Sequence, residues 1–600
     1  MDNKEIAHIL QQTADILEIN DENLFKINAY RRASQSIESL AGDVNQAYQQ
    51  GKLQSIPGVG KGIANYIKDL IETGTCREFE RLKKEIPLGV LKLLQVEGLG
   101  PKKVKLFYKK FRVNSLYKLE KLIKSHKLLK LKGWGKKSEE NILKAITLYK
   151  RFNQRFLLGI IYPLAQEIVK ELKESKLVNQ VEVCGSLRRW QETVGDLDIL
   201  ATSKNPERAV NLFTTLKDIK RIVAKGPTKA HVILKQGIAA DLRVVKPESF
   251  GAAIHYFTGS KAHNIRIRRL GMNKGLRINE YGVYKYKLKT QNAKRSPDGE
   301  AGKMTNQNLK IDEIRKFIKI GGKTEQEVFK AVGLPWIPPE LRENNGEIEA
   351  AKKGKLPKLV NLNDIKGDCH LHTKWSDGRE TIMEMAEQAK KIGYEYIAIT
   401  DHASSIRVAN GLDAQRTLKY LKAIKKADEK IKGIKILSGI EVDIKKDGSL
   451  YLPDKILKQI EVVIAAVHSG FKTNKQEMTE RIIKAMENPY VHILAHPTGR
   501  LINKREPYQA DINQIFEKAK KTKTVLEINA HWRRLDLNAN QARLAHEKGV
   551  EMVISTDAHN SDTLELMKFG VATARKGWLE KKDVINALPL KQFLKVLKRK

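Results

Sequence analysis

The chain has 600 residues and carries 111 Lys and Arg against 70 Asp and Glu, a formal net charge of +41. This length exceeds what one hydrophobic core supports, and the charge favours a polyanionic partner, nucleic acid before a membrane surface, although lysine-rich chains also occur in AT-rich or thermophilic genomes. Three scattered cysteines exclude a disulfide framework, and no apolar run reaches the ~20 residues of a membrane span, so we expect an intracellular protein without membrane segments.

Three segments in the first third share one pattern, in which two glycines flank a hydrophobic residue just before a basic helix start. They are SIPGVGKGIANYI (55–67), QVEGLGPKKVKLF (95–107) and LKLKGWGKKSEENIL (129–143). Paired glycines permit a tight turn, and the amide groups of the following helix can face a phosphate. The candidate DNA-binding residues are Gly58, Gly60, Lys61, Gly98, Gly100, Lys102, Gly133 and Gly135. The alternative interpretation is that the three segments are ordinary turns at helix ends, without a role in binding. The pattern resembles helix–hairpin–helix modules, which contact the DNA backbone without reading sequence.

Residues 1–80, with the basic amphipathic segment FKINAYRRAS (25–34), resemble the small DNA-end-binding domain of family X DNA polymerases. In members with deoxyribose-phosphate lyase activity, a lysine on the helix after the first hairpin forms a Schiff base. The resemblance places Tyr66 at that position, and tyrosine cannot form an imine. Lys61 and Lys68 are nearby but do not align. The usual lyase chemistry is therefore not expected.

The middle third contains VEVCGSLRRWQETVGDLDILAT (181–202), which reads as a strand, a turn at Gly-Ser and a second strand. Alternation along the second strand puts its two acids on one side and Leu197 in the core. A further acid follows a hairpin signal in IAADLRVV (238–245). An acid pair on a strand is often only a solvated face, but Gly-Ser followed by D-x-D favours a nucleotidyltransferase with two Mg²⁺ ions. The predicted catalytic metal ligands are Asp196, Asp198 and Asp241.

This region resembles the palm of family X DNA polymerases. The resemblance implies nucleotide-binding roles for Gly185, Ser186, Arg189, Gly195, Tyr256, Phe257, Gly259 and Asn264, with Mn²⁺ as a possible substitute for Mg²⁺. Among these, Ser186 and Arg189 match the triphosphate-binding pair, and YFTGSKAHN (256–264) matches the segment beside the incoming sugar and base. It also implies that Lys229 and Arg243 lie near DNA strands. The segment GLPWIPPELREN (333–344) resembles the end of the thumb in bacterial members.

After a polar, lysine-rich stretch at 345–362 that predicts a linker, short apolar runs end repeatedly in His, Asp or Glu. They are GDCHLHTKWSDG (367–378), YIAITDH (396–402), ILSGIEVD (436–443), VVIAAVHSG (462–470), HILAHP (492–497), TVLEINAH (524–531) and MVISTDAH (552–559). Strands that alternate with helices form a parallel sheet or barrel, and the residues at their carboxyl ends gather at one mouth. The predicted ligands are His370, His372, Asp377, His402, Glu441, His468, His496, Asp557 and His559. Nine imidazoles and carboxylates exceed the needs of one transition metal, whereas any single histidine could be an ordinary core residue.

These motifs resemble the polymerase and histidinol phosphatase (PHP) domain over residues 363–590. That family is a distorted seven-stranded β/α barrel in which a trinuclear metal centre hydrolyses phosphoesters. The resemblance implies three ions, Mn²⁺ or Zn²⁺, in the following grouping: His370, His372, Glu441 and Asp557; Asp377, His402 and His496; Glu441, His468 and His559. Many relatives have Asn-Pro where this chain has His531-Trp532. His531 could be an additional ligand, but we expect it to support the ligands or to lie at the surface.

The sequence thus predicts a multidomain α+β and α/β protein with helical helix–hairpin–helix N-terminal domains, a nucleotidyltransferase palm with a thumb, and a distorted (β/α)7 PHP barrel. The expected domains are 1–80 (end binding), 81–155 (fingers-like), 156–265 (palm), 266–344 (thumb), 345–362 (linker) and 363–600 (barrel). The expected function is short-gap filling by a DNA-directed DNA polymerase in repair, with a metal-dependent 3′–5′ exonuclease or phosphoesterase acting on 3′ ends or apurinic sites.

The expected partners are gapped or nicked duplex DNA with its 3′ ends, and dNTPs. We expect a monomer in the cytoplasm, close to the nucleoid. A rival hypothesis is a DNA-end-binding platform whose only active enzyme is a small-molecule phosphatase. The intact Asp196, Asp198 and Asp241 and the charge of +41 argue against it.

Overall fold

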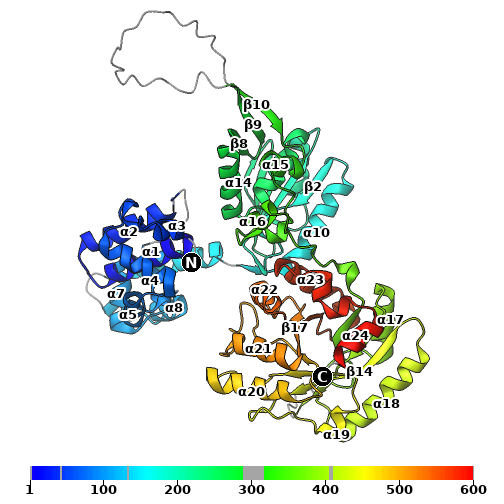
Figure 1. The fold of residues 1–600 in the computed structure, drawn as a ribbon. Coiled ribbons are helices and arrows are strands. Elements are labelled where there is room, and N and C mark those ends of the chain that lie inside the picture. Colours follow the sequence, from blue (N-terminus) through cyan, green and yellow to red (C-terminus); the bar gives the residue numbers. More distant parts are fainter. Residues whose placement is uncertain are drawn as a thin grey trace, which may run out of the picture. The chain divides into compact units, whose positions relative to one another are not determined.

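The computed structural model describes residues 3–38, 40, 44–73, 75–96, 98–130, 134–153, 155–287, 316–404 and 410–598. The chain divides into two compact units, Met1–Gln154 and Arg155–Lys600 (Figure 1). No described helix is long and apolar enough to cross a membrane.

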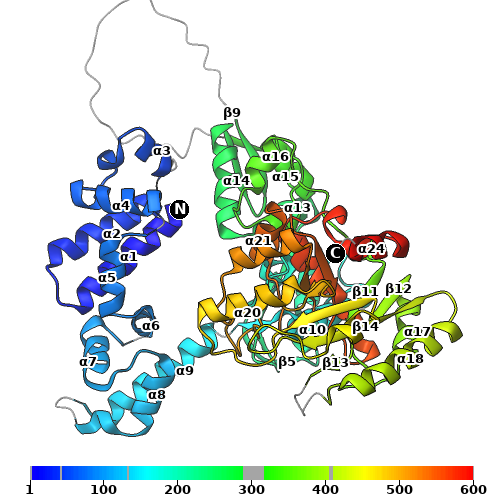
Figure 2. The same ribbon diagram turned by 60° about the horizontal axis from the view of Figure 1, so that its bottom comes forward.

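The described residues of the N-terminal unit form helices and connecting turns (Figure 2). The helices are α1 (Asn3–Ile19), α2 (Leu24–Glu38), α3 (Val44–Gln49), α4 (Lys61–Thr73), α5 (Arg77–Glu85), α6 (Leu88–Leu91), α7 (Pro101–Phe111), α8 (Leu116–Lys124) and α9 (Lys136–Asn153). A single hydrophobic cluster runs from Ile6 to Ile146, so both predicted hairpin regions share one core. Burial of this apolar surface holds short helices that would be marginal alone.

The second unit begins with the palm, whose five-stranded sheet has the order β2-β4-β7-β6-β5. Its elements are β1 (Phe156–Leu157), α10 (Leu158–Glu174), β2 (Gln180–Val183), α11 (Gly185–Arg188), β3 (Thr193–Val194), β4 (Asp196–Thr202), α12 (Pro206–Thr215), β5 (Ile219–Gly226), β6 (Lys229–Leu234) and β7 (Ala239–Val245). Strands β4 and β7 are parallel neighbours in the middle of the sheet, so polar residues at their starts lie side by side.

The thumb follows the palm in the chain, and the two parts share a hydrophobic cluster. The elements of the thumb are α13 (Phe250–Thr258), α14 (Lys261–Asn273), β8 (Leu276–Asn279), β9 (Gly282–Lys287), β10 (Lys316–Gly321), α15 (Glu325–Ala331) and α16 (Glu347–Lys352). Helix α16 lies in the segment expected to be a linker. Its Ile348 is buried in the thumb core, and its fully buried Glu347 pairs with His263 Nδ1 at 2.7 Å. The segment is therefore packed against the thumb.

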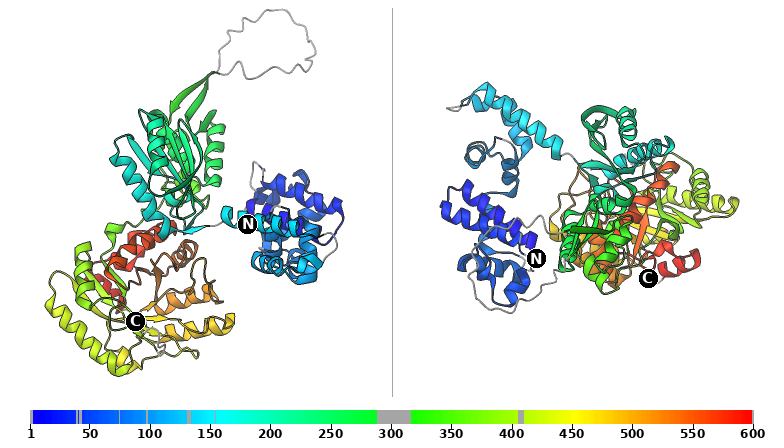
Figure 3. Two further views of the ribbon diagram at one scale, coloured as in Figure 1. Left: turned by 180° about the vertical axis from the view of Figure 1, so that it is seen from behind. Right: turned by 90° about the horizontal axis from the view of Figure 1, so that it is seen from above.

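The C-terminal part is a nearly closed barrel of parallel strands surrounded by helices (Figures 1 and 3). Its strands are β11 (Gly367–Leu371), β12 (Tyr396–Ile399), β13 (His402–Ala403), β14 (Lys435–Asp443), β15 (Val462–Ala466), β16 (Ile493–Leu494), β17 (Val525–Asn529) and β18 (Met552–Ser555). Its helices are α17 (Ile382–Ile392), α18 (Ala414–Lys430), α19 (Asp454–Leu457), α20 (Lys475–Glu487), α21 (Ile512–Thr522), α22 (Ala539–Glu547), α23 (Met567–Lys576) and α24 (Leu590–Leu597). A parallel bridge between Leu371 and Ala558 brings the first and last strands together.

The barrel and the palm share hydrophobic packing. Leu535 and Phe569 of the barrel are buried in the palm core. Trp532 packs so closely on Gly159 of α10 that a Cβ there would overlap the indole ring. This contact gives Trp532 a packing role between the two parts.

Candidate active sites

The three palm carboxylates converge at the start of the β4–β7 pair. Asp198 lies directly opposite Asp241 in the parallel register, and Asp196 precedes it by two residues on the same side of β4. Leu197 between them is fully buried in the palm core. Burial, with the like charges of Asp196 and Asp241, raises the pKa of Asp198 to about 7. An all-oxygen set under mutual repulsion suits a hard divalent cation, which would relieve that repulsion.

Gly185 approaches this site more closely than any side-chain-bearing residue could. The sequence predicted a simple turn here, whereas Gly185–Arg188 form one helical turn, α11. Gly185 has φ +61°, and a Cβ would overlap Asp198 Oδ2. Glycine is therefore required both by the backbone conformation and by the space beside the carboxylate.

Gly185→Ala should consequently lower nucleotide incorporation by roughly 100-fold, because Asp198 must move away from the added methyl group, and a displacement of about 1 Å has effects of that size. Gly237→Ala is the matched control, since Gly237 also has positive φ (+90°) but no atom lies within 4 Å of the position that a Cβ would take. Steady-state gap filling measures both. Equal losses in the two variants would show that backbone strain alone is responsible.

A cavity of about 440 Å³ opens beside the carboxylates. It is lined by Arg155, Gly185, Ser186, Arg189, Gln191, Asp196, Asp198, Tyr256, Phe257, Gly259, Lys261, Asn264 and Arg268. Seven of the eight residues that the resemblance assigns to nucleotide binding thus line one cavity. The eighth, Gly195, lies beside it, where a Cβ would be 3.3 Å from Arg155 Nη1. Sequence reasoning missed Arg155, Gln191, Lys261 and Arg268, of which Gln191 and Lys261 lie inside the motif segments 181–202 and 256–264.

Arg189 and Asn264 are held in this cavity by the protein itself. The Arg189 guanidinium donates to the carbonyl of Thr258 and, through Nε, to Glu343 Oε1 at 2.9 Å. Asn264 Nδ2 donates to the Tyr256 carbonyl at 2.7 Å. Within the described residues, the buried Ser186 Oγ and Asn264 Oδ1 have no hydrogen-bond partner, so both remain available to a ligand.

The two palm residues expected near DNA are register partners on neighbouring strands. Lys229 of β6 lies opposite Arg243 of β7. Both are exposed, and the Arg243 guanidinium lies 4.8 Å from the centre of the Phe257 ring, which lines the cavity. They add positive charge beside the nucleotide cavity.

In the barrel, the nine predicted ligands gather at the carboxyl ends of the strands. Atom distances divide them into three groups around Glu441. Its Oε2 lies 3.4 Å from His370 Nε2 and 3.7 Å from His372 Nε2. Its Oε1 lies 3.0 Å from His496 Nε2 and 3.3 Å from His468 Nε2. The two oxygens of one carboxylate therefore face two different groups, and Oε2 also lies 2.8 Å from His402 Nδ1.

Asp557 completes the first group, with Oδ1 3.2 Å from His372 Nε2. The third group surrounds Asp377 Oδ2, which lies 3.6 Å from His402 Nε2 and 3.4 Å from His559 Nε2. His372 also stands within ligand range of this group, and His402 of the group of Glu441 and His468.

The grouping implied by the resemblance is wrong for two residues. His496 lies with Glu441 and His468, because β15 and β16 are adjacent strands and the two imidazole centres are 5.2 Å apart. His559 lies with Asp377, because the segment after β18 packs against the one after β11. In that contact Arg379 N donates to the His559 carbonyl at 2.8 Å.

The donor atoms fit metal ions. In the described part of the chain, His370 Nε2, both ring nitrogens of His372, His402 Nδ1 and Glu441 Oε2 are buried without a hydrogen-bond partner. Burial, together with the imidazoles of His559 and His402, lowers the pKa of His372 to about 3, which keeps it neutral as a ligand must be. Such unpartnered polar atoms are costly unless a ligand satisfies them.

Three further residues hold the ligands in place. Glu527 accepts from His370 Nδ1 at 2.7 Å, Asp443 pairs with His468 Nδ1 at 2.7 Å, and Asn529 Nδ2 donates to Asp557 Oδ2 at 3.1 Å. Such partners fix the tautomer and orientation of a ligating imidazole. Sequence reasoning did not assign them, although Asp443 follows Glu441 by two residues on one strand face. His531 Nδ1 instead accepts from Arg533 N at 3.2 Å, and His531 belongs to none of the three groups.

In the N-terminal unit, the first two hairpins share their backbone geometry. Gly58 has φ +82° and Gly98 φ +79°, and an amide-to-carbonyl bond of 3.0 Å closes each turn, from Val59 to Ile56 and from Leu99 to Val96. Gly60 and Gly100 immediately precede α4 and α7, whose first turns expose Lys61 and Lys102. Gly135 precedes α9 in the same way, whereas Gly133 lies outside the described residues.

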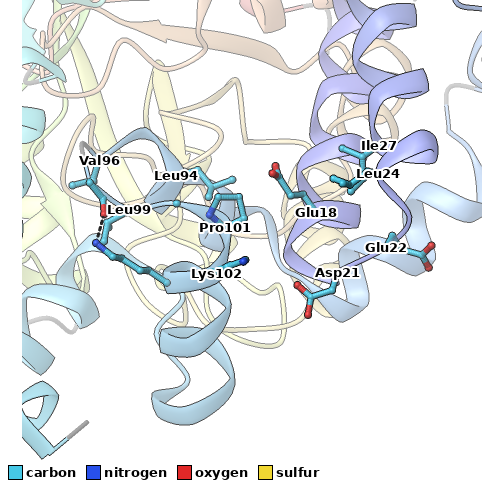
Figure 4. Close-up of a pocket in the computed structure, with 13 residues that line it drawn as sticks. Glu18, Asp21, Glu22, Leu24, Ile27, Leu94, Val96, Leu99, Pro101 and Lys102 are labelled. Carbon is cyan, nitrogen blue, oxygen red and sulfur yellow. Dashed lines mark hydrogen bonds between the residues drawn. The ribbon is translucent and has the colours of Figure 1, made fainter. Parts of the chain in front are cut away.

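A cavity of about 880 Å³ lies beside the second hairpin (Figure 4). Acidic residues at the end of α1 and in the turn before α2, including Glu18 and Asp21, face Pro101 and Lys102 across it. It contains no convergent catalytic set, so we assign the chemistry to the palm and the barrel.

Tyr66 is a core residue of the first hairpin domain. It is 3% exposed, its hydroxyl lies 2.7 Å from Thr13 Oγ1, and its ring packs edge-on against Tyr30. Deoxyribose-phosphate lyase activity should therefore be at least ~100-fold below that of a lysine-bearing enzyme, because Schiff-base chemistry needs an accessible amine. Borohydride trapping on an incised abasic duplex measures it. Efficient trapping would point to Lys61 or to Lys68, which pairs with Glu72 at 3.9 Å.

The geometry defines a two-site protein: a nucleotidyltransferase palm with a thumb, joined to a barrel whose clustered His, Asp and Glu side chains could hold metal ions. Three family models match, the helix-hairpin-helix domain over residues 1–76, the DNA polymerase beta thumb over 253–343 and the PHP domain over 368–531. The chain is 39% identical over the full length of both sequences to the DNA polymerase/3'-5' exonuclease PolX of Bacillus subtilis (strain 168). It therefore belongs to the family X DNA polymerases that carry a PHP domain.

The barrel also has relatives of its own. A probable phosphatase of Thermoanaerobacter sp. (strain X514) is 31% identical over 39% of this chain and 96% of its own length. A probable phosphatase of Caldanaerobacter subterraneus subsp. tengcongensis is 32% identical over 32% of this chain and 75% of its own length. The predicted family and fold class are confirmed.

Proposed function

We propose that the chain is a DNA-directed DNA polymerase that fills short gaps and whose barrel removes nucleotides from 3′ ends. The single observation that carries this proposal is the convergence of Asp196, Asp198 and Asp241 beside a cavity lined by Ser186 and Arg189. The full-length similarity to a polymerase/exonuclease supports it. The separate carboxylate and histidine sites match the two activities, one for synthesis and one for hydrolysis.

In the palm, Asp196, Asp198 and Asp241 would hold two Mg²⁺ ions, with Mn²⁺ as a substitute. When bound, such ions lower the pKa of a primer hydroxyl and neutralise the leaving pyrophosphate. The protein's own residues bind and orient the nucleotide. Arg189 presents a guanidinium to the triphosphate, since its Nε is already tied to Glu343, and Ser186 Oγ is a further donor. Asn264 offers its unpartnered amide oxygen to the base or sugar.

In the barrel, three ions would be held by the groups His370, His372, Glu441 and Asp557; Glu441, His468 and His496; and Asp377, His402 and His559. Imidazole-rich sets favour Mn²⁺ or Zn²⁺ over Mg²⁺. Bound together, such ions activate water and stabilise the leaving oxygen of a phosphodiester. Glu527 and Asp443 keep His370 and His468 oriented. This centre would act on 3′ ends or apurinic sites.

The proposed organisation is an end-binding domain (1–80), a fingers-like region (81–155), a palm (156–265), a thumb (266–344), a connecting segment (345–362) and a barrel (363–600). The hairpins would contact the phosphates of gapped or nicked DNA, dNTPs would be the second substrate, and the protein would act as a cytoplasmic, nucleoid-associated monomer. The exposed Lys61 and Lys102 and the net charge of +41 support the DNA contacts.

DNA affinity should depend steeply on salt and little on sequence. Each phosphate neutralised by the protein contributes about −0.9 to the slope of log K against log salt, and two or more hairpins with lysines should give a slope steeper than about −2. Titration of gapped duplexes of two unrelated sequences between 50 and 200 mM salt, roughly, measures this. A shallower slope, or strong preference for one sequence, would contradict backbone recognition.

The proposed function itself is tested by adding one dNTP to a one-nucleotide gap, and separately by following shortening of a 3′ end with Mn²⁺. Template-directed incorporation and shortening should both occur. The rival phosphatase platform predicts release of phosphate from small phosphomonoesters without incorporation.

A further inference from the structure

We propose that helix α23 of the barrel is a working part of the polymerase nucleotide cavity, and that Lys576 is a positioning residue for Arg189. This inference rests on the proposed polymerase function. Lys576 Nζ donates to the backbone carbonyl of Arg189 at 3.1 Å and lies 3.5 Å from Glu343 Oε1. Its side chain is 9% exposed, so the ammonium is almost enclosed between barrel, palm and thumb.

Glu343 is the centre of this arrangement. One carboxylate oxygen, Oε1, accepts from Arg189 Nε at 2.9 Å, from Gln191 Nε2, and from Lys576. Arg189 and Gln191 both line the nucleotide cavity. Burial lowers the pKa of Lys576, while the charge of Glu343 opposes this. A buried ammonium needs hydrogen-bond partners in place of water, and here these are the Arg189 carbonyl and Glu343 Oε1. Removing the ammonium of Lys576 would therefore remove a contact that holds Arg189 in place.

Helix α23 also packs against Trp190, the residue that follows Arg189. The Trp190 ring stacks on Tyr162 with ring centres 4.8 Å apart, and Phe569 of α23 packs against both rings at 6.1 and 5.8 Å. Phe569 fixes the aromatic side of the Arg188–Gln191 segment, and Lys576, two turns further along α23, fixes its backbone.

Helix α23 is in turn anchored in the barrel wall. Gly570 lies so close to strands β17 and β18 that a Cβ would overlap Ile554 Cγ2 and would be 2.7 Å from Ala530 Cβ. Ile554 lies in the strand that leads to the ligand Asp557. The barrel thus provides a rigid support for the triphosphate-binding arginine of the palm, and the polymerase site of this chain is incomplete without its nuclease domain.

The test uses the full-length protein and a one-nucleotide gap. Lys576→Met should raise KM for the dNTP about 5- to 10-fold while kcat stays within about 2-fold, because it removes ground-state and transition-state binding equally. Exonuclease activity should stay within about 2-fold and reports that the barrel is folded. Lys518→Met is the matched control, since Lys518 is a largely buried lysine (19% exposed) paired with Glu487 wholly within the barrel, and it should change neither activity.

Two further variants separate positioning from general damage. Glu343→Gln changes the thumb residue that contacts both Arg189 and Lys576, and it should raise KM for the dNTP by a similar factor. In an Arg189→Ala background, Lys576→Met should add less than about 2-fold, because there is no guanidinium left to position. An unchanged KM in Lys576→Met, or full additivity with Arg189→Ala, would overturn the inference and leave the polymerase function standing. Absence of incorporation by the wild type would overturn both.

Discussion

Asp198→Ala should abolish nucleotide addition, with a loss of at least ~1000-fold, equivalent to about 4 kcal/mol of activation free energy. Asp198 lies between Asp196 on its own strand and Asp241 on the neighbouring strand, so its removal opens the middle of the carboxylate set. The two remaining acids cannot hold a pair of divalent ions in place. Single-nucleotide incorporation on a gapped duplex measures the loss.

Glu182→Ala is the matched control for that variant. Glu182 is an exposed acid on β2, paired with Leu200 of β4, and so lies in the same sheet outside the carboxylate set. It should retain incorporation, and both variants should retain 3′-end shortening, since none of the barrel ligand groups includes Asp198. Near-normal incorporation by Asp198→Ala would contradict the palm assignment and would favour the rival phosphatase platform.

Strand periodicity was sufficient to predict that Asp196 and Asp198 lie on one face of their strand. Asp196 and Asp198 had to share a face because side chains alternate along a strand, and Leu197 between them had to be buried. The hairpin signal before Asp241 predicted a third acid on a further strand. Alternation does not specify which strands are neighbours, and the direct opposition of Asp198 and Asp241 became visible only in the sheet order.

The same limit explains the error in the barrel. Each ligand could be assigned to the end of its own apolar run, but grouping the ligands requires knowing which run ends lie side by side. His496 and His468 follow adjacent strands, whereas His559 lies in a segment that turns toward Asp377. The nine residues that the resemblance assigned do lie together, but two of them lie in other groups than it implied.

The stretch 345–362 shows a second limit of prediction from local sequence patterns. Its composition is polar and lysine-rich, and it lacks a clear apolar period, which is typical of a linker. Glu347 is nevertheless fully buried, because His263, 84 positions earlier in the chain, pairs with it. A buried hydrogen bond between distant residues leaves no periodic signal in either segment, so local patterns could not reveal it. Lys576 and Arg189 are separated in the same way, by 387 positions.

Glu441→Gln should eliminate 3′-end shortening, with a loss of at least ~1000-fold, while gap filling stays within about 2-fold. Glu441 is 1% exposed, and its two carboxylate oxygens face two of the three ligand groups. Although burial raises it, the surrounding imidazoles hold the pKa of Glu441 well below its usual range, so the group is a carboxylate at neutral pH. A neutral amide removes that charge from both groups at once.

Metal content distinguishes this explanation from simple misfolding. Wild type should bind three ions per chain, and Glu441→Gln should keep at most the ion of Asp377, His402 and His559, because Glu441 is not among its ligands and touches that group only through His402, whose Nδ1 lies 2.8 Å from Glu441 Oε2. Glu461→Gln is the control. Glu461 lies outside the ligand groups and accepts from Ser438, which is on β14, the strand that carries Glu441. After chelation, Mn²⁺ should restore wild-type shortening better than Mg²⁺, since imidazole ligands suit transition metals. One ion per chain in a fully active wild type would refute the three-ion centre, whereas metal-dependent hydrolysis by the barrel would stand.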